Sequence, residues 1–429
     1  MNNQNIKLTD EQLSAVEMVK NNYVSILTGG PGTGKTTTIK EILTWAQSKK
    51  MSVIQCAPTG KAAKRMEEAT NYPSSTIHKA LGATMEKGKF VFFYGETCPL
   101  LTDLIIVDEV SMVTNNLMAS LLRAIDKRTK ILFVGDQGQL PSVGVGAVLR
   151  DFLDSGVVPH IQLTKIHRNS GDIVKVCHAI QKGEKPVASS ELDIKSGKNF
   201  RHIEASTPEK IIDIICQVVM KMKDRGYDPV WDVQVISPTN VKTNLSCENL
   251  NSVLQGLLNP KGKAVDSGDD KNGNKNGSKN GNGKDYKNIF RIKDKVIQTK
   301  NEQMNEGYIV NGDLGFIKSF EKTNMKVNFL WPDREVAIPQ KKNDLLLAYC
   351  ITCHRMQGSE APVVIIPVHK CFGNFVTRSW IYTAISRAKD ICFTVGQFRA
   401  VEQAAKRIDM DLRLTMLREK LQERFFDGI

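Results

Sequence analysis

The run Gly-Gly-Pro-Gly-Thr-Gly-Lys-Thr at residues 29–36 constrains this chain more than any other feature. It follows an apolar, strand-like run and precedes a helix-like segment, which is the setting that a phosphate-binding loop requires. The glycines let backbone N–H groups turn inward around phosphate oxygens, and the following helix adds its positive N-terminal end. Lys35 supplies a mobile positive charge, and Thr36 supplies a hydroxyl for Mg²⁺. The run predicts an α/β fold that uses ATP and Mg²⁺. The residues expected to hold the nucleotide are Gly30, Gly32, Thr33, Gly34, Lys35, Thr36 and Thr37.

Apolar strand-like runs alternate with helix-like segments in two parts of the chain. The first part has predicted strands at 23–28, 52–57, 104–108 and 130–135. The second has predicted strands at 232–237, 346–352, 363–368 and 391–395, and a helix at 208–223 that Thr207 can cap. This alternation predicts parallel sheets covered by helices on both faces. We therefore expect two α/β domains of similar size.

Two segments interrupt this alternation. Residues 261–288 are rich in Gly, Asn, Lys and Asp and nearly free of apolar residues, so they cannot bury enough surface to fold. We expect a disordered loop there, which is either a tolerated surface insertion or a basic tether for nucleic acid. Residues 289–342 carry strand-like runs with turn signals, which predicts a small β domain inserted in the second α/β domain.

The charge balance favours a polyanionic partner. Lys and Arg exceed Asp and Glu by 13, which suits nucleic acid, although a merely basic surface gives the same excess. No secretory signal opens the chain, and no apolar run approaches the roughly 20 residues of a membrane span. Nine scattered cysteines favour free thiols, and the one CxxC pair at 350–353 lacks the second pair that zinc needs. We expect a cytoplasmic protein without membrane contact.

Polar residues follow two of the predicted strands. Asp108 and Glu109 end the strand at 104–108. Beside a phosphate loop, Asp108 would hold Mg²⁺ and Glu109 would orient and polarise the attacking water, although a solvated strand end is the alternative. Gln139 follows the next strand and could distinguish ATP from ADP, because only ATP offers a γ-phosphate oxygen. The alternative for Gln139 is a polar turn.

Arg168 and Arg387 fall at or beyond the start of the second α/β half. Phosphoryl transfer benefits from an arginine on the developing charge. If that arginine comes from a second domain, ATP can draw the two domains together and hydrolysis can release them. Either residue could equally be a surface arginine.

Three further residues stay ambiguous on local grounds. Gln12 fits a capping box with Thr9, or it could pair with the adenine edge. His78 and His354 lie among polar and basic residues, so each either contacts a nucleic-acid backbone or is an isolated structural histidine.

These motifs, in this order, resemble a superfamily 1 helicase, and most closely the RecD-like group of superfamily 1B. The similarity runs from Leu8 to about Leu417, apart from the Asn/Gly-rich insertion. The matching blocks are GGPGTGKTT, the APTGKAA of 57–63, the TIH of 76–78, VDEVSM, GDQGQLPSVG, the IHR of 166–168, the block from 348 to the QGSE of 357–360, and YTAISRA. The chain departs from the group's pattern at Arg355-Met356 and at Gly138.

The resemblance implies two RecA-like parallel-sheet domains with a small β-hairpin insertion and a small Src-homology-type β-barrel insertion. The first domain, 1A, would span 1–155, with a pin hairpin at about 84–101. The second, 2A, would span 156–260 and 343–429. The barrel, 2B, would span 289–342, after the loop at 261–288.

The resemblance also assigns roles to single residues. It implies an adenine contact for Gln12, γ-phosphate sensing for Gln139, Arg168 and Arg387, and a nucleotide-linked role for Glu360. The residues expected to contact single-stranded nucleic acid are Pro58, Thr59, His78, Thr352 and His354. Phe92 and Phe93 in the hairpin segment would stack on or split bases, or else pack the hairpin down.

The activity implied is that of an ATP-dependent DNA helicase that moves 5′ to 3′ on single-stranded DNA and unwinds duplex junctions, active as a monomer and with replication, recombination or repair partners. Three alternatives remain open. They are an RNA helicase, a translocase that strips proteins from a strand, and an ATP-gated nucleic-acid clamp that does not unwind.

Overall fold

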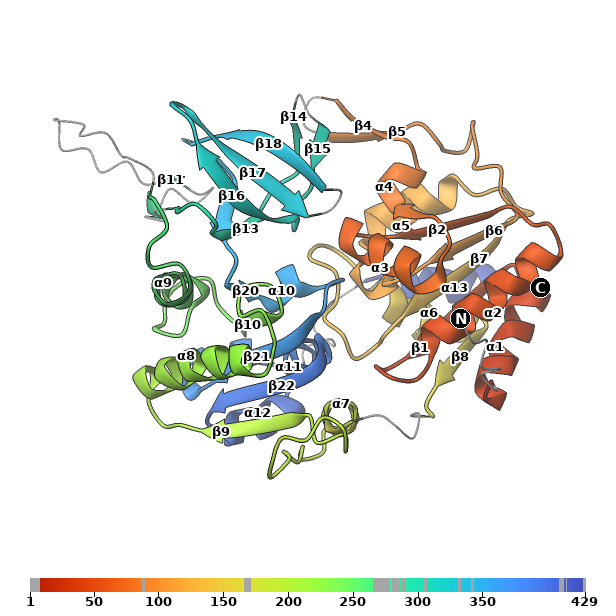
Figure 1. Cartoon of the computed structure of the whole chain (residues 1–429). Coiled ribbons are helices and arrows are strands. Elements are labelled where there is room, and N and C mark those ends of the chain that lie inside the picture. Colours follow the sequence, from red (N-terminus) through yellow and green to blue (C-terminus); the bar gives the residue numbers. More distant parts are fainter. Residues whose placement is uncertain are drawn as a thin grey trace.

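The computed structural model describes residues 8–86, 89–165, 171–264, 278–279, 285–286, 290–304, 307–330, 333–340, 343–408, 413 and 415–426. Two α/β units lie side by side, and an antiparallel sheet stands above the second of them (Figure 1). Arg168 and most of the predicted disordered loop at 261–288 lie outside the described residues. No helix in the described part of the chain is both long enough and apolar enough to cross a membrane.

The first unit is built on a six-stranded parallel sheet. The strand order is β3 (Ser74–Thr76), β2 (Val53–Ala57), β6 (Leu104–Val107), β7 (Lys130–Gly135), β1 (Val24–Gly29) and β8 (His160–Leu163). Helices α1 (Asp10–Asn21), α2 (Lys35–Ser48) and α3 (Gly60–Thr70) bury apolar side chains in a core with one face of the sheet. Helices α4 (Ile77–Ala80), α5 (Asn115–Arg123) and α6 (Val148–Ser155) do so with the other face, near the 3₁₀ turn η1 (Val110–Met112). The buried strands are near-continuous apolar runs, as a sheet covered on both faces requires.

The second unit is built on a five-stranded parallel sheet. The strand order is β20 (Cys350–Thr352), β10 (Val233–Ser237), β21 (Ala361–Val368), β22 (Ala388–Gly396) and β9 (Phe200–Glu204). Its helical elements are α7 (Asp172–Lys182), α8 (Pro208–Asp224), α9 (Cys247–Leu258), α10 (Cys353–Met356), η2 (Lys370–Phe375), α11 (Arg378–Ser386) and α12 (Phe398–Lys406). Helix α8 begins as predicted, with Thr207 accepting a hydrogen bond from the backbone N–H of Lys210.

The remaining strands are antiparallel. Five form a sheet in the order β18 (Asp333–Pro339), β17 (Asn324–Leu330), β16 (Leu314–Phe320), β13 (Lys295–Gln298) and β19 (Leu345–Leu347). Three pairs stand apart: β4 (Ala83–Glu86) with β5 (Lys89–Phe92), β11 (Ser278–Lys279) with β12 (Asp285–Tyr286), and β14 (Glu302–Met304) with β15 (Gly307–Ile309). The β4–β5 pair lies where the pin is expected and the five-stranded sheet lies where the barrel is expected. The pin and the barrel as such stay predictions.

Three sequence-based boundaries differ from the structure. The division at 155/156 falls before β8, which pairs with β1 and so belongs to the first sheet. The single strand predicted at 346–352 is two strands, because the chain leaves the antiparallel sheet after Leu347 and enters the parallel sheet at Cys350.

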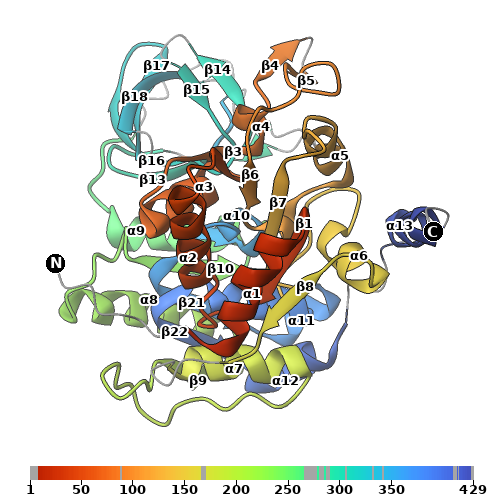
Figure 2. The ribbon, with the colours of Figure 1, turned by 90° about the vertical axis from the view of Figure 1, so that its right-hand side faces the viewer.

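The third difference concerns the C-terminal end, which we assigned to the second domain. Helix α13 (Leu417–Phe426) instead returns to the first unit and lies beside α6 (Figure 2). Leu417 and Leu421 pack against the core on that side of the first sheet.

Candidate nucleotide site between the two domains

The phosphate loop connects β1 to α2. Gly34 precedes the helix in the left-handed conformation, with φ of 91°, which a glycine adopts without strain. Thr33 folds inward and donates a hydrogen bond from its hydroxyl to Gly30 O, at 2.8 Å. The Lys35 ammonium lies over the loop and donates to the carbonyls of Gly29 and Gly30, at 2.5 and 3.1 Å. The lysine is therefore held where an incoming phosphate would meet it.

Gln12 forms the capping box that its sequence context allows and also contacts the phosphate loop. Its side-chain oxygen accepts from the Thr9 backbone N–H at 2.9 Å and Thr9 caps the helix in return, so the capping box is confirmed. Its amide nitrogen donates to Gly34 O at 3.3 Å, which ties α1 to the phosphate loop. The adenine contact stays a prediction.

Asp108 and Glu109 follow β6 beside this loop. Burial, followed by the neighbouring Glu109 charge, raises the pKa of the Asp108 carboxyl to about 6, against the opposing effects of Lys35 and Arg65. A bound cation would relieve that cost. Asp108 and the exposed Thr36 hydroxyl are the hard oxygen donors that Mg²⁺ prefers. The donor set thus suits the predicted metal.

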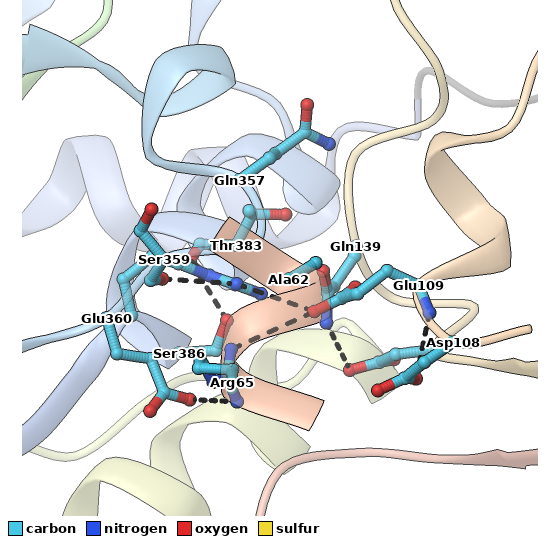
Figure 3. Close-up of polar contacts among 12 residues, drawn as sticks. Ala62, Arg65, Asp108, Glu109, Gln139, Gln357, Ser359, Glu360, Thr383 and Ser386 are labelled. Atoms are coloured by element: carbon cyan, nitrogen blue, oxygen red, sulfur yellow. Dashed lines mark hydrogen bonds and ion pairs between the residues drawn. The ribbon is translucent and has the colours of Figure 1, made fainter. Parts of the chain in front are cut away.

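Two arginines, one from each domain, lie within 4.0 Å of the Glu109 carboxylate (Figure 3). Its backbone has φ of 55°, an uncommon conformation for a non-glycine residue. Arg65, on α3 of the first domain, places Nη1 4.0 Å from Glu109 Oε1 and Nη2 2.6 Å from Glu360 Oε1. Arg387, at the end of α11 in the second domain, places Nη1 3.8 Å from the same Glu109 oxygen. Residues from both domains therefore converge on the candidate catalytic carboxylate.

A second set of contacts joins the domains at the Gln139 loop. Tyr382 donates from its hydroxyl to Asp136 Oδ2 at 2.8 Å, and the Leu140 backbone N–H donates to the Thr383 hydroxyl at 2.8 Å. The Gln357 amide nitrogen donates to Leu140 O at 3.0 Å. Gln139 itself is buried beside Asp136, and its side-chain oxygen has no hydrogen-bond partner among the described residues. This oxygen can accept a hydrogen bond from a donor such as water, whereas a phosphate oxygen would need the amide nitrogen that is paired with Asp136.

Comparisons with known proteins agree with this geometry. Residues 7–202 match an AAA domain, and residues 347–395 match a UvrD-like helicase C-terminal domain. The chain is 34% identical to the ATP-dependent RecD2 DNA helicase of Deinococcus radiodurans over 97% of its length, and 27% identical to the RecD subunit of the RecBCD enzyme of Mycolicibacterium smegmatis over 96%. The chain is similar to RecD-like helicases of superfamily 1B along nearly its whole length. It spans 52% of the length of the Deinococcus protein and 75% of that of the Mycolicibacterium protein.

A solved structure of related fold is the Pif1 helicase from Bacteroides in complex with ADP-AlF3 and single-stranded DNA. It has a TM-score of 0.52 and 18% sequence identity, and the match covers 99% of this chain and 98% of that one. Two RecA-like domains are therefore the framework of this RecD-like chain.

Three of the residues predicted to contact nucleic acid are engaged in contacts within the protein or are buried. Thr59 caps α3 by accepting from the Ala62 backbone N–H at 3.3 Å, and Thr352 is buried at the start of α10. His78 packs on the rings of Phe90 and Phe92, with centroids 4.6 and 5.8 Å away, and burial lowers its pKa. These contacts are compatible with purely structural roles, so strand binding by the three residues stays a prediction.

Three other members of the predicted strand-contacting set are more accessible. Pro58 is half-buried in front of Thr59, and His354 is exposed on α10. Phe93 is 69% exposed just beyond β5 and meets Tyr94 edge-on, with ring centroids 5.1 Å apart. Phe93 is thus the hairpin aromatic that is free to meet a base, whereas Phe92 packs on His78.

The sequence did not single out Arg65, Gln357, Tyr382 and Thr383 as part of this site. Tyr382 and Thr383 belong to the YTAISRA block and Gln357 to the QGSE block, so the blocks carried a signal for three of them. Nothing local distinguishes Arg65 from the other basic residues of α3, and only its contacts identify it.

Proposed function

We propose that this chain is an ATP-dependent DNA helicase, which moves 5′ to 3′ along single-stranded DNA and unwinds duplex DNA by ATP hydrolysis. The observation that carries the proposal is the split site: Lys35, Asp108 and Glu109 come from the first domain, and Arg387 and Glu360 come from the second. The name and sequence identity of the Deinococcus relative support DNA as the nucleic acid.

ATP would lie between the phosphate loop and the second domain. The Lys35 ammonium would exchange its two carbonyl partners for β- and γ-phosphate oxygens. Mg²⁺, held by Thr36 and Asp108, would neutralise developing phosphate charge. Glu109 would orient and polarise the attacking water. Gln139 would turn its amide nitrogen, which donates to Asp136 in this structure, toward the γ-phosphate.

Arg387 supplies the link between chemistry and movement. Its guanidinium is buried, and it donates to Thr383 O and Ser359 O at 3.3 and 3.4 Å, so it moves with the second domain. Turning from Glu109 to the γ-phosphate would draw the domains together, and loss of that phosphate would release them. Arg168 is proposed as a second γ-phosphate arginine on the strength of the family motif alone.

Repeated closure and release would step the protein along a strand held by Pro58, Thr59 and His78 on the first domain and by Thr352 and His354 on the second. Phe93 would meet the bases at the junction. We propose that a monomer suffices for this cycle, because the whole ATP site forms within one chain, and that the protein acts in the cytoplasm with replication, recombination or repair partners.

Strand-displacement assays on matched DNA and RNA duplexes, each with a 5′ or a 3′ single-stranded tail, test the proposal. We expect ATP-dependent separation of 5′-tailed DNA. Unwinding of only 3′-tailed DNA would contradict the direction, and preference for RNA would contradict the substrate. DNA-stimulated hydrolysis without unwinding would favour a protein-stripping translocase or an ATP-gated clamp.

A further inference from the structure

Arg65 is the side chain in this site to which the proposed chemistry gives no role. It lies 2.6 Å from Glu360 across the domain boundary and 4.0 Å from Glu109 within its own domain (Figure 3). Among the ion pairs of the described residues, Glu360 has one further cation, Lys389, at 3.8 Å, and Glu109 has one further cation, Arg387, at 3.8 Å. Arg65 is thus the group that these ion pairs share between the candidate catalytic carboxylate and the second domain.

Helix α3, which carries Arg65, packs against the second domain. The turn at Gly358, in the second domain, packs directly on the first turn of α3. A Cβ on Gly358 would lie 2.8 Å from the Thr59 hydroxyl oxygen and 3.2 Å from Ala62 Cβ. Gly358 also has φ of 69°, which a side chain would strain. If the 357–360 turn moves, Gly358 therefore pushes on the first turn of α3, and Glu360 pulls on Arg65 through their ion pair.

The two arginines at Glu109 have different roles in the proposed reaction. Arg387 is expected to leave Glu109 for the γ-phosphate as the cleft closes. Arg65 has a closer partner in Glu360 and can keep its contact with Glu109 while Arg387 moves. Without Arg65, and with Arg387 turned away, Glu109 would keep no cation among the ion pairs of the described residues, beside Asp108 and the incoming phosphates. A carboxylate in that setting is repelled from the position in which it meets the water.

We propose that Arg65 is a positioning residue for hydrolysis, which holds the Glu109 carboxylate in place and ties that placement to Glu360 of the second domain. This inference rests on the proposed ATP hydrolysis. The position of the Glu109 carboxylate would then depend on the second domain in two ways: through the Arg65–Glu360 ion pair and through Arg387.

The test is steady-state ATP hydrolysis by Arg65→Ala, with and without single-stranded DNA, alongside equilibrium binding of a non-hydrolysable ATP analogue. We expect kcat to fall about tenfold or more, while KM and the analogue Kd stay within about threefold, because the phosphate loop is untouched. Arg65→Lys should recover part of the loss, since it keeps the charge but cannot serve two carboxylates in the way that a planar guanidinium does.

A double-mutant cycle tests the tie between the domains. Glu360→Gln removes the charge that Arg65 meets in the second domain. If the two residues act together, Arg65→Ala and Glu360→Gln combined should lower kcat little more than Arg65→Ala alone. Arg128→Ala is the matched control, because Arg128 is 88% exposed on the first domain and pairs only with the nearby Asp126 among the described ion pairs. That variant should keep wild-type kcat.

Three results would overturn the inference: wild-type kcat in Arg65→Ala, a parallel loss of analogue binding, or additive losses in the cycle. If circular dichroism shows that Arg65→Ala does not fold, the Arg65→Lys and Glu360→Gln variants still test the inference. Wild-type kcat in both of them would contradict it. A wild-type protein that does not hydrolyse ATP contradicts the proposed function instead, so the two failures are distinguishable.

Discussion

Gly138 of the first domain packs against the Tyr382 ring of the second, so a single methyl group there probes whether the domains must meet as the structure has them. A Cβ on Gly138 would lie 2.8 Å from Cε1 and Cζ of Tyr382 and 3.2 Å from Cδ1. The Tyr382 ring is fully buried, and its hydroxyl is held by Asp136 at 2.8 Å, so the ring cannot turn aside without losing that hydrogen bond. Gly138→Ala therefore either separates the Gly138 loop from Tyr382 or leaves a steric clash between them.

Overpacking of this kind costs about 1–3 kcal/mol. Gly138 does not adopt a left-handed backbone conformation, so the penalty is steric and falls on the joined arrangement of the domains. We expect a fall in kcat of roughly 5- to 160-fold if the whole penalty is felt when the cleft closes, since each 1.36 kcal/mol is a factor of ten. The melting temperature should fall by only a few degrees.

The assay is DNA-stimulated ATP hydrolysis together with thermal unfolding. Gly256→Ala in α9 is the matched control, because nothing lies within 4 Å of the added Cβ. It should leave kcat unchanged and stabilise the helix by up to about 1 kcal/mol. Wild-type kcat in Gly138→Ala would show that closure does not bring Tyr382 onto this loop, and the assembled site would have to be revised.

Three further predictions follow from other parts of the chain. Lys35→Ala should abolish binding of an ATP analogue while leaving the melting temperature within a few degrees, and retained binding would contradict the loop assignment. Deletion of residues 262–287 should leave ATP hydrolysis intact, whereas a large drop in DNA affinity would support the basic-tether interpretation. Burial lowers the pKa of Lys295 to about 7, against an ordinary value of about 10.4 in the unfolded chain. Between those values the unfolded state binds more protons, so this lysine makes stability rise with pH. Denaturant titrations at pH 7 and 9 should show a smaller rise for Lys295→Met, and an unchanged rise would refute this origin.

The nucleotide-binding framework could be predicted from the sequence because its signals are local. The phosphate loop needs its glycines, Lys35 and Thr36 in one short run, and each strand that leads to the site is a compact apolar segment with polar residues at its end. The structure has a strand that overlaps each predicted run, from β1 at 24–29 to β22 at 388–396.

The features that the sequence did not predict depend on contacts between distant segments. The short strand β8 joins the first sheet through pairing with β1, although its exposed and half-buried residues give little apolar signal. The run at 346–352 is apolar throughout, so its composition does not reveal that its two halves belong to different sheets.

The C-terminal helix and the Arg65 contacts show the same limit. Helix α13 is held to the first domain by packing on α6, and Arg413 donates to the carbonyls of Gly144 and Gly146, at 3.0 and 2.8 Å. No periodicity within residues 413–426 predicts which domain they contact. Likewise, Arg65 is one of several basic residues on an amphipathic helix until Glu360 and Glu109 are brought to it.

The central claim is that one ATP site is completed by an arginine from the second domain. ATP turnover by Arg387→Ala, measured with saturating single-stranded DNA beside analogue binding, tests it most directly. We expect retained ATP binding and a loss of turnover on the order of 10³-fold or more, as for arginine fingers elsewhere. Near-normal DNA-stimulated turnover by that variant would contradict the assignment, and with it the two-domain motor.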